Sequence, residues 1–168
     1  MSENGLSLAD DDVESLLQAY DSLCAFPDVP SMLDRMAEAR DVAAVIFSNG
    51  TQSMASNSVH RSSSGLLSRS SVFHDIVTVE SVRQYKPAPA VYAHLAERVG
   101  KTLSQMNDIW LISGNPFDIV GGRQVGMNAI WIDRAGHGWV DAAIPPIRPT
   151  ATVTRLEEIL DVIENHQP

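Results

Sequence analysis

The amino-acid sequence predicts a three-layer α/β fold in which a doubly wound, mostly parallel sheet lies between two layers of helices. Short apolar runs at residues 43–47, 76–79, 109–112 and 129–132 are typical of strands, and segments with helical spacing alternate with them. This alternation indicates βαβ units. The length of 168 residues and the hydrophobic fraction of 44% are sufficient for one domain with its own core.

The net charge and the cysteine content exclude several classes of protein. The net charge of −9 argues against a surface for nucleic acids or anionic membranes. Cys24 is the only cysteine, so no intramolecular disulfide is possible. The first residues are polar and acidic rather than a signal peptide, and no apolar run approaches about 18 residues. We therefore expect a cytoplasmic protein that makes no contact with membranes.

Two helices are predicted near the N-terminus. Residues 10–12 are aspartates, which suit the first turn of a helix. An apolar stripe with helical spacing follows and stops before Pro27 and Pro30. We expect it to pack on the core, with a partner-binding face as the alternative; it consists of Val13, Leu16, Leu17, Tyr20, Leu23 and Cys24. Ser31 is a plausible N-cap for the second helix.

The next predicted strand, residues 43–47, is continuously apolar, which indicates burial on both faces. It ends at a polar turn that begins with Ser48. Residues 52–71 are rich in serine and are expected to form a short helix and loops on a solvated surface, with phosphorylation as the alternative. After the strand at 76–79, a helix is expected from Pro89 to Gly100.

The C-terminal part begins with the strand at 109–112, which runs into a polar turn and a helix that carries Asp118. A strand at 129–132 and a short strand at 152–153 follow. Thr154 and Glu157 have the spacing of a capping box at the start of the last helix.

Polar side chains at three strand ends are expected to converge, because the carboxyl ends of parallel strands lie at one edge of the sheet. They come from Ser48 and Asn49, from Lys86, and from residues 113–118. The lysine neutralises negative charge, the hydroxyl and amide groups donate hydrogen bonds, and Asp118 holds the lysine or a water molecule. This set predicts an oxyanion or carboxylate pocket. The alternative is a purely structural ion pair between Lys86 and Asp118.

Three motifs in this order resemble a known family. Residues 48–51 read SNGT, residues 85–92 read YKPAPAVY, and residues 113–134 read SGNPFDIVGGRQVGMNAIWIDR. The series is similar to the haloacid dehalogenase superfamily, and within it to the type II (L-)2-haloacid dehalogenases, with SNG, YKP-x3-VY and SSN-x-WD-x2-G. The resemblance extends from about residue 16 to the C-terminus. It implies a Rossmann-like core at residues 31–168, preceded at residues 1–30 by a remnant of a cap domain.

The resemblance implies roles for the first two motifs. Ser48 and Asn49 would bind the carboxylate of the substrate or an oxyanion. Lys86 would stabilise the charge of the nucleophile, and Tyr92 would lie nearby in the pocket.

The third motif carries implied roles as well as two differences from the family. Ser113, Asn115 and Asp118 would position the lysine and the hydrolytic water. Phe117 occupies a pocket position at which the family usually has tryptophan, and Gly114 replaces a serine.

One family motif has no counterpart here. The family's D-x-Y-G-T, which carries the aspartate nucleophile, is not matched before Ser48, and neither is the substrate-binding arginine of the early cap region. Displacement through an aspartyl ester needs that carboxylate, so ordinary dehalogenase or phosphatase activity is not expected. No cofactor and no metal are expected, because one magnesium ligand of the phosphatase relatives would be missing and the dehalogenases use no metal.

The missing motif also has a structural consequence. In the family its strand is the central one and lies between the strands that here end at Ser48 and Ser113. Unpaired apolar edges inside a core are costly. We therefore expect these two strands to pair with each other, or the chain to form a homodimer or pair with another chain, or both.

Three hypotheses of function follow. The first is a repurposed enzyme that catalyses isomerisation, elimination, cyclisation or hydration of a small carboxylate or enolate-like substrate without a covalent step. Its catalytic residues would be Lys86, Asp118 and Ser48, and its substrate-binding residues Asn49, Tyr92, Ser113, Asn115 and Phe117. The second is a non-catalytic binding or partner subunit. The third is a fragment of an ordinary 2-haloacid dehalogenase.

Overall fold

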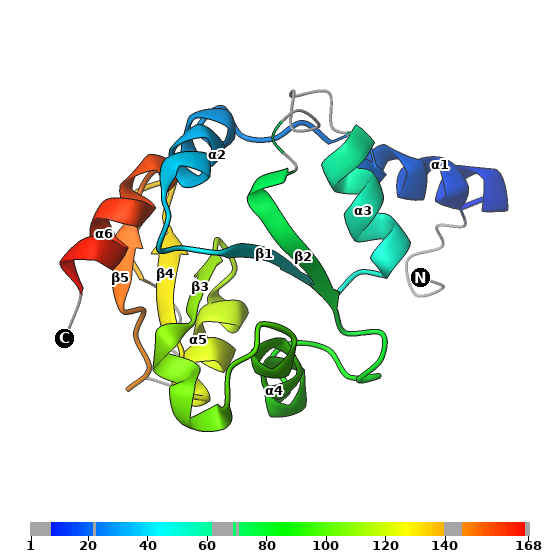
Figure 1. The fold of residues 1–168 in the computed structure, drawn as a ribbon. Coiled ribbons are helices and arrows are strands. Elements are labelled where there is room, and N and C mark those ends of the chain that lie inside the picture. Colours follow the sequence, from blue (N-terminus) through cyan, green and yellow to red (C-terminus); the bar gives the residue numbers. More distant parts are fainter. Residues whose placement is uncertain (1–7, 22, 62–68, 70, 140–145, 167–168) are drawn as a thin grey trace.

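Two parallel sheets form the centre of the molecule (Figure 1). The computed structural model describes residues 8–21, 23–61, 69, 71–139 and 146–166. In the first sheet, β1 (Ala44–Ser48) pairs with β2 (Phe73–Thr78). In the second, the order is β3 (Trp110–Ser113), β4 (Asn128–Ile132) and β5 (Ala151–Val153). The predicted α/β fold with parallel strands is confirmed.

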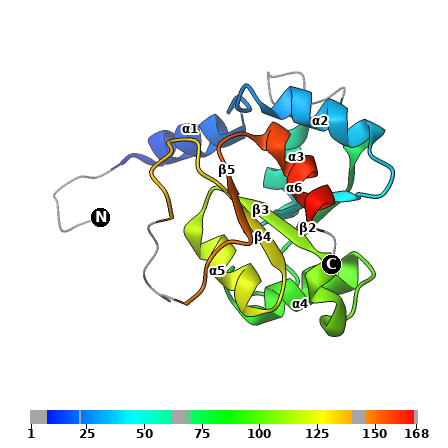
Figure 2. The same ribbon diagram turned by 90° about the vertical axis from the view of Figure 1, so that its left-hand side faces the viewer.

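Helices cover both faces of the second sheet (Figures 1 and 2). On one face lie α4 (Pro89–Arg98) and α5 (Pro116–Gln124), and on the other α2 (Val29–Glu38) and α6 (Ile159–Asn165). Of the other two helices, α3 (Gln52–Arg61) packs beside β2 of the first sheet, and α1 (Asp10–Asp21) packs against α3 (Figure 1). Two short 3-10 helices span Leu103–Asp108 and Leu156–Glu158.

The side chains of β4 show how the layers are held together. Ala129 and Trp131 belong to the apolar cluster on the α4 and α5 side, and Ile130 and Ile132 to the cluster on the α2 and α6 side. Successive side chains of a strand point to opposite faces, so one apolar strand supplies both clusters. Burial of each large apolar side chain stabilises the fold by about 1.5–3 kcal/mol.

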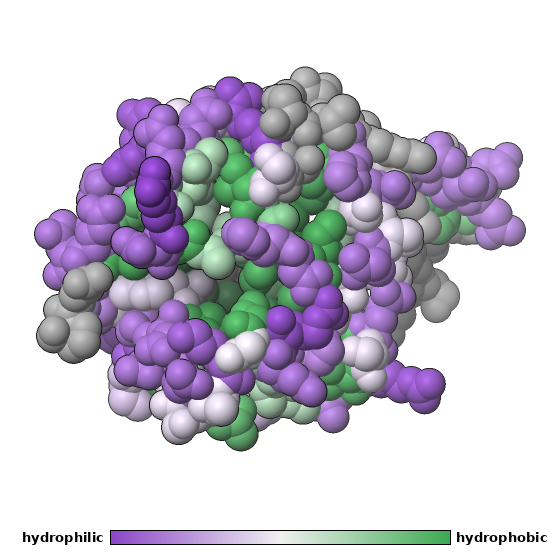
Figure 3. All heavy atoms as spheres, in the orientation of Figure 1, coloured by the Kyte–Doolittle hydropathy of each residue, from purple (hydrophilic) through white to green (hydrophobic). Residues whose placement is uncertain are grey.

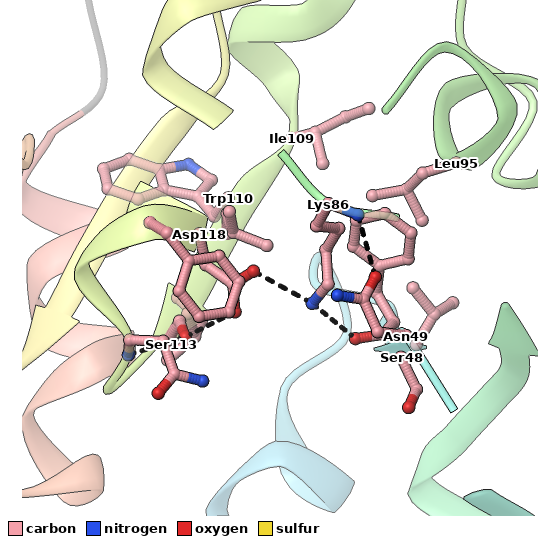
Figure 4. A pocket seen from close by; sticks show the side chains of 14 residues that line it. Ser48, Asn49, Lys86, Leu95, Ile109, Trp110, Ser113 and Asp118 are labelled. Atoms are coloured by element: carbon pink, nitrogen blue, oxygen red, sulfur yellow. Dashed lines mark hydrogen bonds and ion pairs between the residues drawn. The ribbon is translucent and has the colours of Figure 1, made fainter. Parts of the chain in front are cut away.

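The prediction that the strands ending at Ser48 and Ser113 pair with each other is wrong for the part of the chain that the structure describes. There, β1 pairs only with β2, and β3 only with β4. Each strand is held in its own sheet, and the Lys86 and Asp118 side chains lie between the carboxyl ends of β1 and β3 (Figure 4). Direct pairing would have to displace these two buried charged groups.

The burial of β1 also differs from the prediction. All five of its residues are only half-buried, whereas four of the five residues of β4 are buried. The continuous apolar run indicated burial on both faces, but the edge of β1 that faces β3 has no neighbouring strand among the described residues.

Two helix starts differ from the predicted ones. The first is α2, which begins at Val29 after Asp28, with Pro30 in its first turn, so Ser31 is not its N-cap. Proline is tolerated in a first turn because the N–H that it lacks has no partner inside the helix. At the start of the last helical segment, the backbone N–H and hydroxyl of Thr154 donate to Glu158 rather than to Glu157.

The apolar stripe predicted at residues 13–24 does not pack fully on the core. Val13 and Leu16 of α1 are exposed, and so are Leu23 and Cys24, which follow the end of α1 at Asp21. The side chains of Leu17 and Tyr20 lie outside the described part. The assignment of residues 1–30 to a cap remnant stays a prediction. Among the described helices none combines the length and apolar character needed to cross a membrane, and the cytoplasmic location stays a prediction.

Asp28 joins the N-terminal part of the chain to the C-terminal part. Its carboxylate accepts a hydrogen bond of 2.9 Å from the backbone N–H of Leu156 and bonds of 3.1 and 3.2 Å from Arg134. Burial opposes ionisation, but these hydrogen bonds outweigh it and lower the pKa of Asp28 below its ordinary value of 3.8.

We expect Asp28→Asn to lower the free energy of unfolding at pH 7 by about 1–2 kcal/mol, because charge-assisted hydrogen bonds are lost. The control Asp108→Asn breaks only the exposed pair with Lys101 and should cost less than about 1 kcal/mol. Since the folded pKa of Asp28 is depressed, its contribution is present above about pH 4 and is lost as the pH falls through the folded pKa. Urea unfolding across pH measures this, and a difference from wild type that persists unchanged in acid would contradict it.

Candidate functional site

A cavity of about 420 Å³ lies between the carboxyl ends of β1 and β3 (Figure 4). The structure brings seven of the predicted site residues together in its wall, and they come from the ends of β1 and β3, the turn before α4 and the start of α5. These residues are Ser48, Asn49, Lys86, Ser113, Asn115, Phe117 and Asp118.

Lys86 crosses the space between the two sheets. Its backbone N–H donates to the Asn49 side-chain oxygen at 2.9 Å, which fixes the turn before α4 against the end of β1. Its ammonium donates to the Phe47 carbonyl at 3.2 Å, lies 4.7 Å from the centre of the Phe47 ring, and is 3.1 Å from Asp118 Oδ1. Only 7% of its side chain is exposed. The positive charge is therefore held at one point of the cavity wall.

Asp118 lies in the first turn of α5, where the positive end of the helix dipole stabilises a carboxylate. Its Oδ2 accepts a hydrogen bond of 2.8 Å from the Ser113 hydroxyl. Its Oδ1 is buried and accepts no hydrogen bond from the described residues, so the Lys86 ammonium is its ionic neighbour there. This oxygen therefore has capacity left to accept a hydrogen bond.

Two tight turns shape the polar end of the cavity. The Ser48 hydroxyl accepts a bond of 2.9 Å from the N–H of Gly50, and the Ser113 hydroxyl accepts one of 3.0 Å from the N–H of Asn115. Each hydroxyl is thereby oriented by the backbone that follows it. The hydroxyl of Ser48 keeps its own proton available for donation, since no described group accepts it.

Tyr92 is the predicted site residue that the structure does not place in the cavity wall. Its side chain is fully buried, packs edge-on against Phe47 with ring centres 5.7 Å apart, and points its hydroxyl at the Asp118 carbonyl at 3.5 Å. Burial, with the nearby Asp118 charge, raises the pKa of the Tyr92 phenol, so the phenol is neutral at physiological pH. In this position the Tyr92 side chain packs behind the cavity wall, where it contacts Phe47 and Asp118.

The remaining predicted residues lie at the mouth. Phe117 is 44% exposed and Asn115 is also exposed. Both precede Asp118 in the chain and line the cavity, so a ligand in the cavity can contact them. Their side chains are free to contact such a ligand without breaking a bond of the site.

Sequence reasoning missed the apolar part of the wall. Val45, Leu95, Ile109, Trp110 and Ile112 line the same cavity. All of them lie in segments whose apolar character indicated core packing. The signal that would have found them is the unmatched central strand, since its absence leaves its two neighbours facing an open space.

The donor set of the site suits an anionic organic ligand. It holds one ammonium, one carboxylate that the ammonium already contacts, and neutral hydroxyl and amide groups. Across the ranges that the structure describes, no three His, Cys, Asp or Glu side chains are grouped as a metal site.

Comparison with known families finds one match that covers most of the chain. The model of the haloacid dehalogenase-like hydrolases matches residues 2–126. The (S)-2-haloacid dehalogenase 4A of Burkholderia cepacia is 28% identical over 74% of this chain and 50% of its own length. The haloacetate dehalogenase H-2 of Moraxella sp. (strain B) is 30% identical over 78% of this chain and 54% of its own. The chain thus spans about half the length of these two relatives.

Solved structures agree in fold. The L-2-haloacid dehalogenase from Xanthobacter autotrophicus superposes with a TM-score of 0.79 at 21% identity, over 99% of this chain and 71% of that one. A second L-2-haloacid dehalogenase, RSc1362, also gives 0.79, at 26% identity, over 97% of this chain and 66% of that one. The described part of the chain therefore has the fold of these L-2-haloacid dehalogenases.

We expect Gly121→Ala to lower the free energy of unfolding, because the added methyl group has no room next to Tyr92 and Pro87. A Cβ at Gly121 would overlap the Tyr92 hydroxyl and lie 2.7 Å from Pro87 Cβ, which would push apart the segments that carry Lys86 and Asp118. Overpacking of this kind costs about 1–3 kcal/mol. The matched control Gly114→Ala meets only the Ile132 carbonyl at 3.8 Å and should be close to neutral. Thermal unfolding compares the two, and equal stabilities would refute this account of the packing.

Proposed function

This chain belongs to the haloacid dehalogenase-like hydrolase family, and from that premise we propose that its polar cavity binds a small carboxylate or enolate-like ligand and promotes acid–base chemistry on it without a covalent step. The observation that carries the proposal is the buried Lys86–Asp118 pair, 3.1 Å apart, which faces a cavity of about 420 Å³. The names of both relatives refer to haloacids, which are small carboxylates.

Lys86 supplies the charge for such a ligand. An ammonium has three N–H groups. One is directed to the Phe47 carbonyl and another is available to Asp118, so at least one remains for a ligand oxygen. In a site that is largely removed from water, this charge stabilises a carboxylate or a developing enolate more strongly than it would at the surface.

Asp118 and Ser48 supply the proton chemistry of the proposal. Asp118 Oδ1, which is 3.1 Å from the Lys86 ammonium, is the oxygen that would accept a proton from a ligand or a water molecule, and Ser113 and the helix terminus orient the carboxylate. The Ser48 hydroxyl would donate a hydrogen bond to a ligand oxygen. Asn49, Asn115 and Phe117 line the cavity and would position the ligand.

A second candidate is the hydrolytic reaction of the family, carried out by a longer assembly of which this chain is a part. The observation in its favour is that the chain spans about half the length of its relatives. Release of chloride from (S)-2-chloropropionate only when a fragment with the family's D-x-Y-G-T motif is added to this chain would favour this candidate, because the three matched motifs contain no nucleophile.

We expect the chain to bind pyruvate and to catalyse exchange of its methyl protons in D₂O, and we expect Lys86→Met to weaken binding at least about tenfold, or about 1.4 kcal/mol. Asp118→Asn should abolish exchange. NMR spectroscopy follows both the exchange and the shifts of the Asn49 and Ser113 amide signals. Lys101→Met, which removes only an exposed pair with Asp108, is the matched control.

Lys86→Met leaves the Asp118 charge without its partner and can disturb the fold. Ser48→Ala leaves the ion pair intact and is therefore measured beside it. We expect weaker binding and a loss of stability of only about 1 kcal/mol, because the mutation removes one hydrogen bond, from the Gly50 N–H. Binding and exchange that are unaffected by Ser48→Ala, Lys86→Met and Asp118→Asn together would refute the proposal.

A further inference from the structure

A second, apolar cavity of about 540 Å³ continues the first one along the space between β1 and β3. Val45, Ile109, Trp110 and Ile112 line both cavities. The apolar cavity is closed on one side by side chains of α2 and α6, including Met36. Figure 3 shows apolar side chains gathered around a hollow near the middle of this face. We call this continuous space between β1 and β3 the slot.

Both walls of the slot are strand edges without a partner strand in the described part of the chain. The first sheet ends at β1 and the second at β3. An unpaired edge presents backbone N–H and C=O groups that seek a further strand, and in parallel sheets such edges are normally covered. Here two edges face the same space.

The two edges run in the same direction. Ala44 and Trp110, at the amino ends of β1 and β3, line the apolar cavity. Ser48 and Ser113, at the carboxyl ends, line the polar one. A strand inserted between them in parallel orientation would therefore find matching hydrogen-bond partners on both sides.

We propose that the slot takes up an extended, apolar segment of another polypeptide chain, about as long as the five residues of β1, that lies parallel to β1 and β3 and joins the two sheets into one. The sheet would then have the order β2, β1, guest strand, β3, β4, β5. The proposal does not depend on the chemistry of the polar cavity.

The unpaired strand edges and the apolar walls of the slot favour an extended polypeptide as its ligand. Only an extended backbone supplies N–H and C=O groups alternately to two edges, and the apolar walls above and below favour β-branched side chains. A second copy offers no free strand within the described ranges, because its β2, β4 and β5 are already paired in its own sheets. The relatives are about twice as long as the matched part, so chain beyond these residues exists in proteins of this kind.

The test uses the full chain and an acetylated, amidated probe peptide, Lys-Lys-Val-Ile-Val-Ile-Val-Lys-Lys. We expect hydrogen exchange of the β1 and β3 amides that point into the slot to slow at least about tenfold when the peptide is bound, with the outer edges of β2 and β5 unchanged. A nitroxide at the carboxyl end of the peptide should broaden the amide signals of Ser48 and Ser113. A nitroxide at its amino end should instead broaden those of Ala44 and Trp110.

Two control peptides separate insertion from addition at a single edge. One carries N-methyl groups on the three valines and the other on the two isoleucines, so that each blocks one edge of the peptide. A guest that uses both edges loses at least about tenfold in affinity with either control.

Three results would overturn the proposal. The first is full affinity of either N-methylated peptide, since binding would then use one edge. The second is no change in exchange at β1 and β3. The third is protection of these amides in the chain alone, because the slot would already be filled, by a second copy if the protection rises with protein concentration.

Discussion

The Lys86 ammonium and the Asp118 carboxylate, 3.1 Å apart, connect two sheets that share no strand pairing in the described part of the chain. Both side chains are more than nine-tenths buried, and removing two charges from water costs several kcal/mol per ion. The pair persists because each charge has further partners. Lys86 donates to the Phe47 carbonyl, and Asp118 accepts from Ser113 at the positive end of α5. The position of the polar cavity follows from this contact.

The space between β1 and β3 has two chemical characters along its length. At the carboxyl ends it is lined by the charged pair, hydroxyls and amides, and further along by apolar side chains of both sheets and of α2 and α6. Ser48, Asn49, Lys86 and Asp118 at the polar end belong to the three sequence motifs that resemble the family. A guest strand as long as β1 would reach Ser48 and Ser113, so the proposed strand site ends at the edge of the polar cavity.

Much of this arrangement could be predicted from the sequence. The apolar runs indicate the strands, and because parallel strands end at one edge of the sheet, Ser48, Lys86 and Asp118 are expected to converge. The rest depends on contacts between distant residues. Glu157 bonds Ser31 while Glu158 caps the last helical segment, and local spacing does not distinguish two adjacent glutamates. Tyr92 fits the motif, yet its side chain lies beneath the cavity because Gly121 leaves room for its hydroxyl. The separation of β1 from β3 depends on the positions of the buried Lys86 and Asp118 side chains between them. The spacing of apolar residues in the sequence does not predict these positions.

The central claim is that the Lys86–Asp118 contact couples the carboxyl ends of β1 and β3 across the polar cavity. A double-mutant cycle with Lys86→Met, Asp118→Asn and the double variant, followed by urea unfolding, measures the coupling free energy of the pair directly. We expect a coupling of about 2 kcal/mol or more, because each single variant strands a buried partner. A coupling within about 0.5 kcal/mol of zero would show that the two residues act independently and would contradict the account.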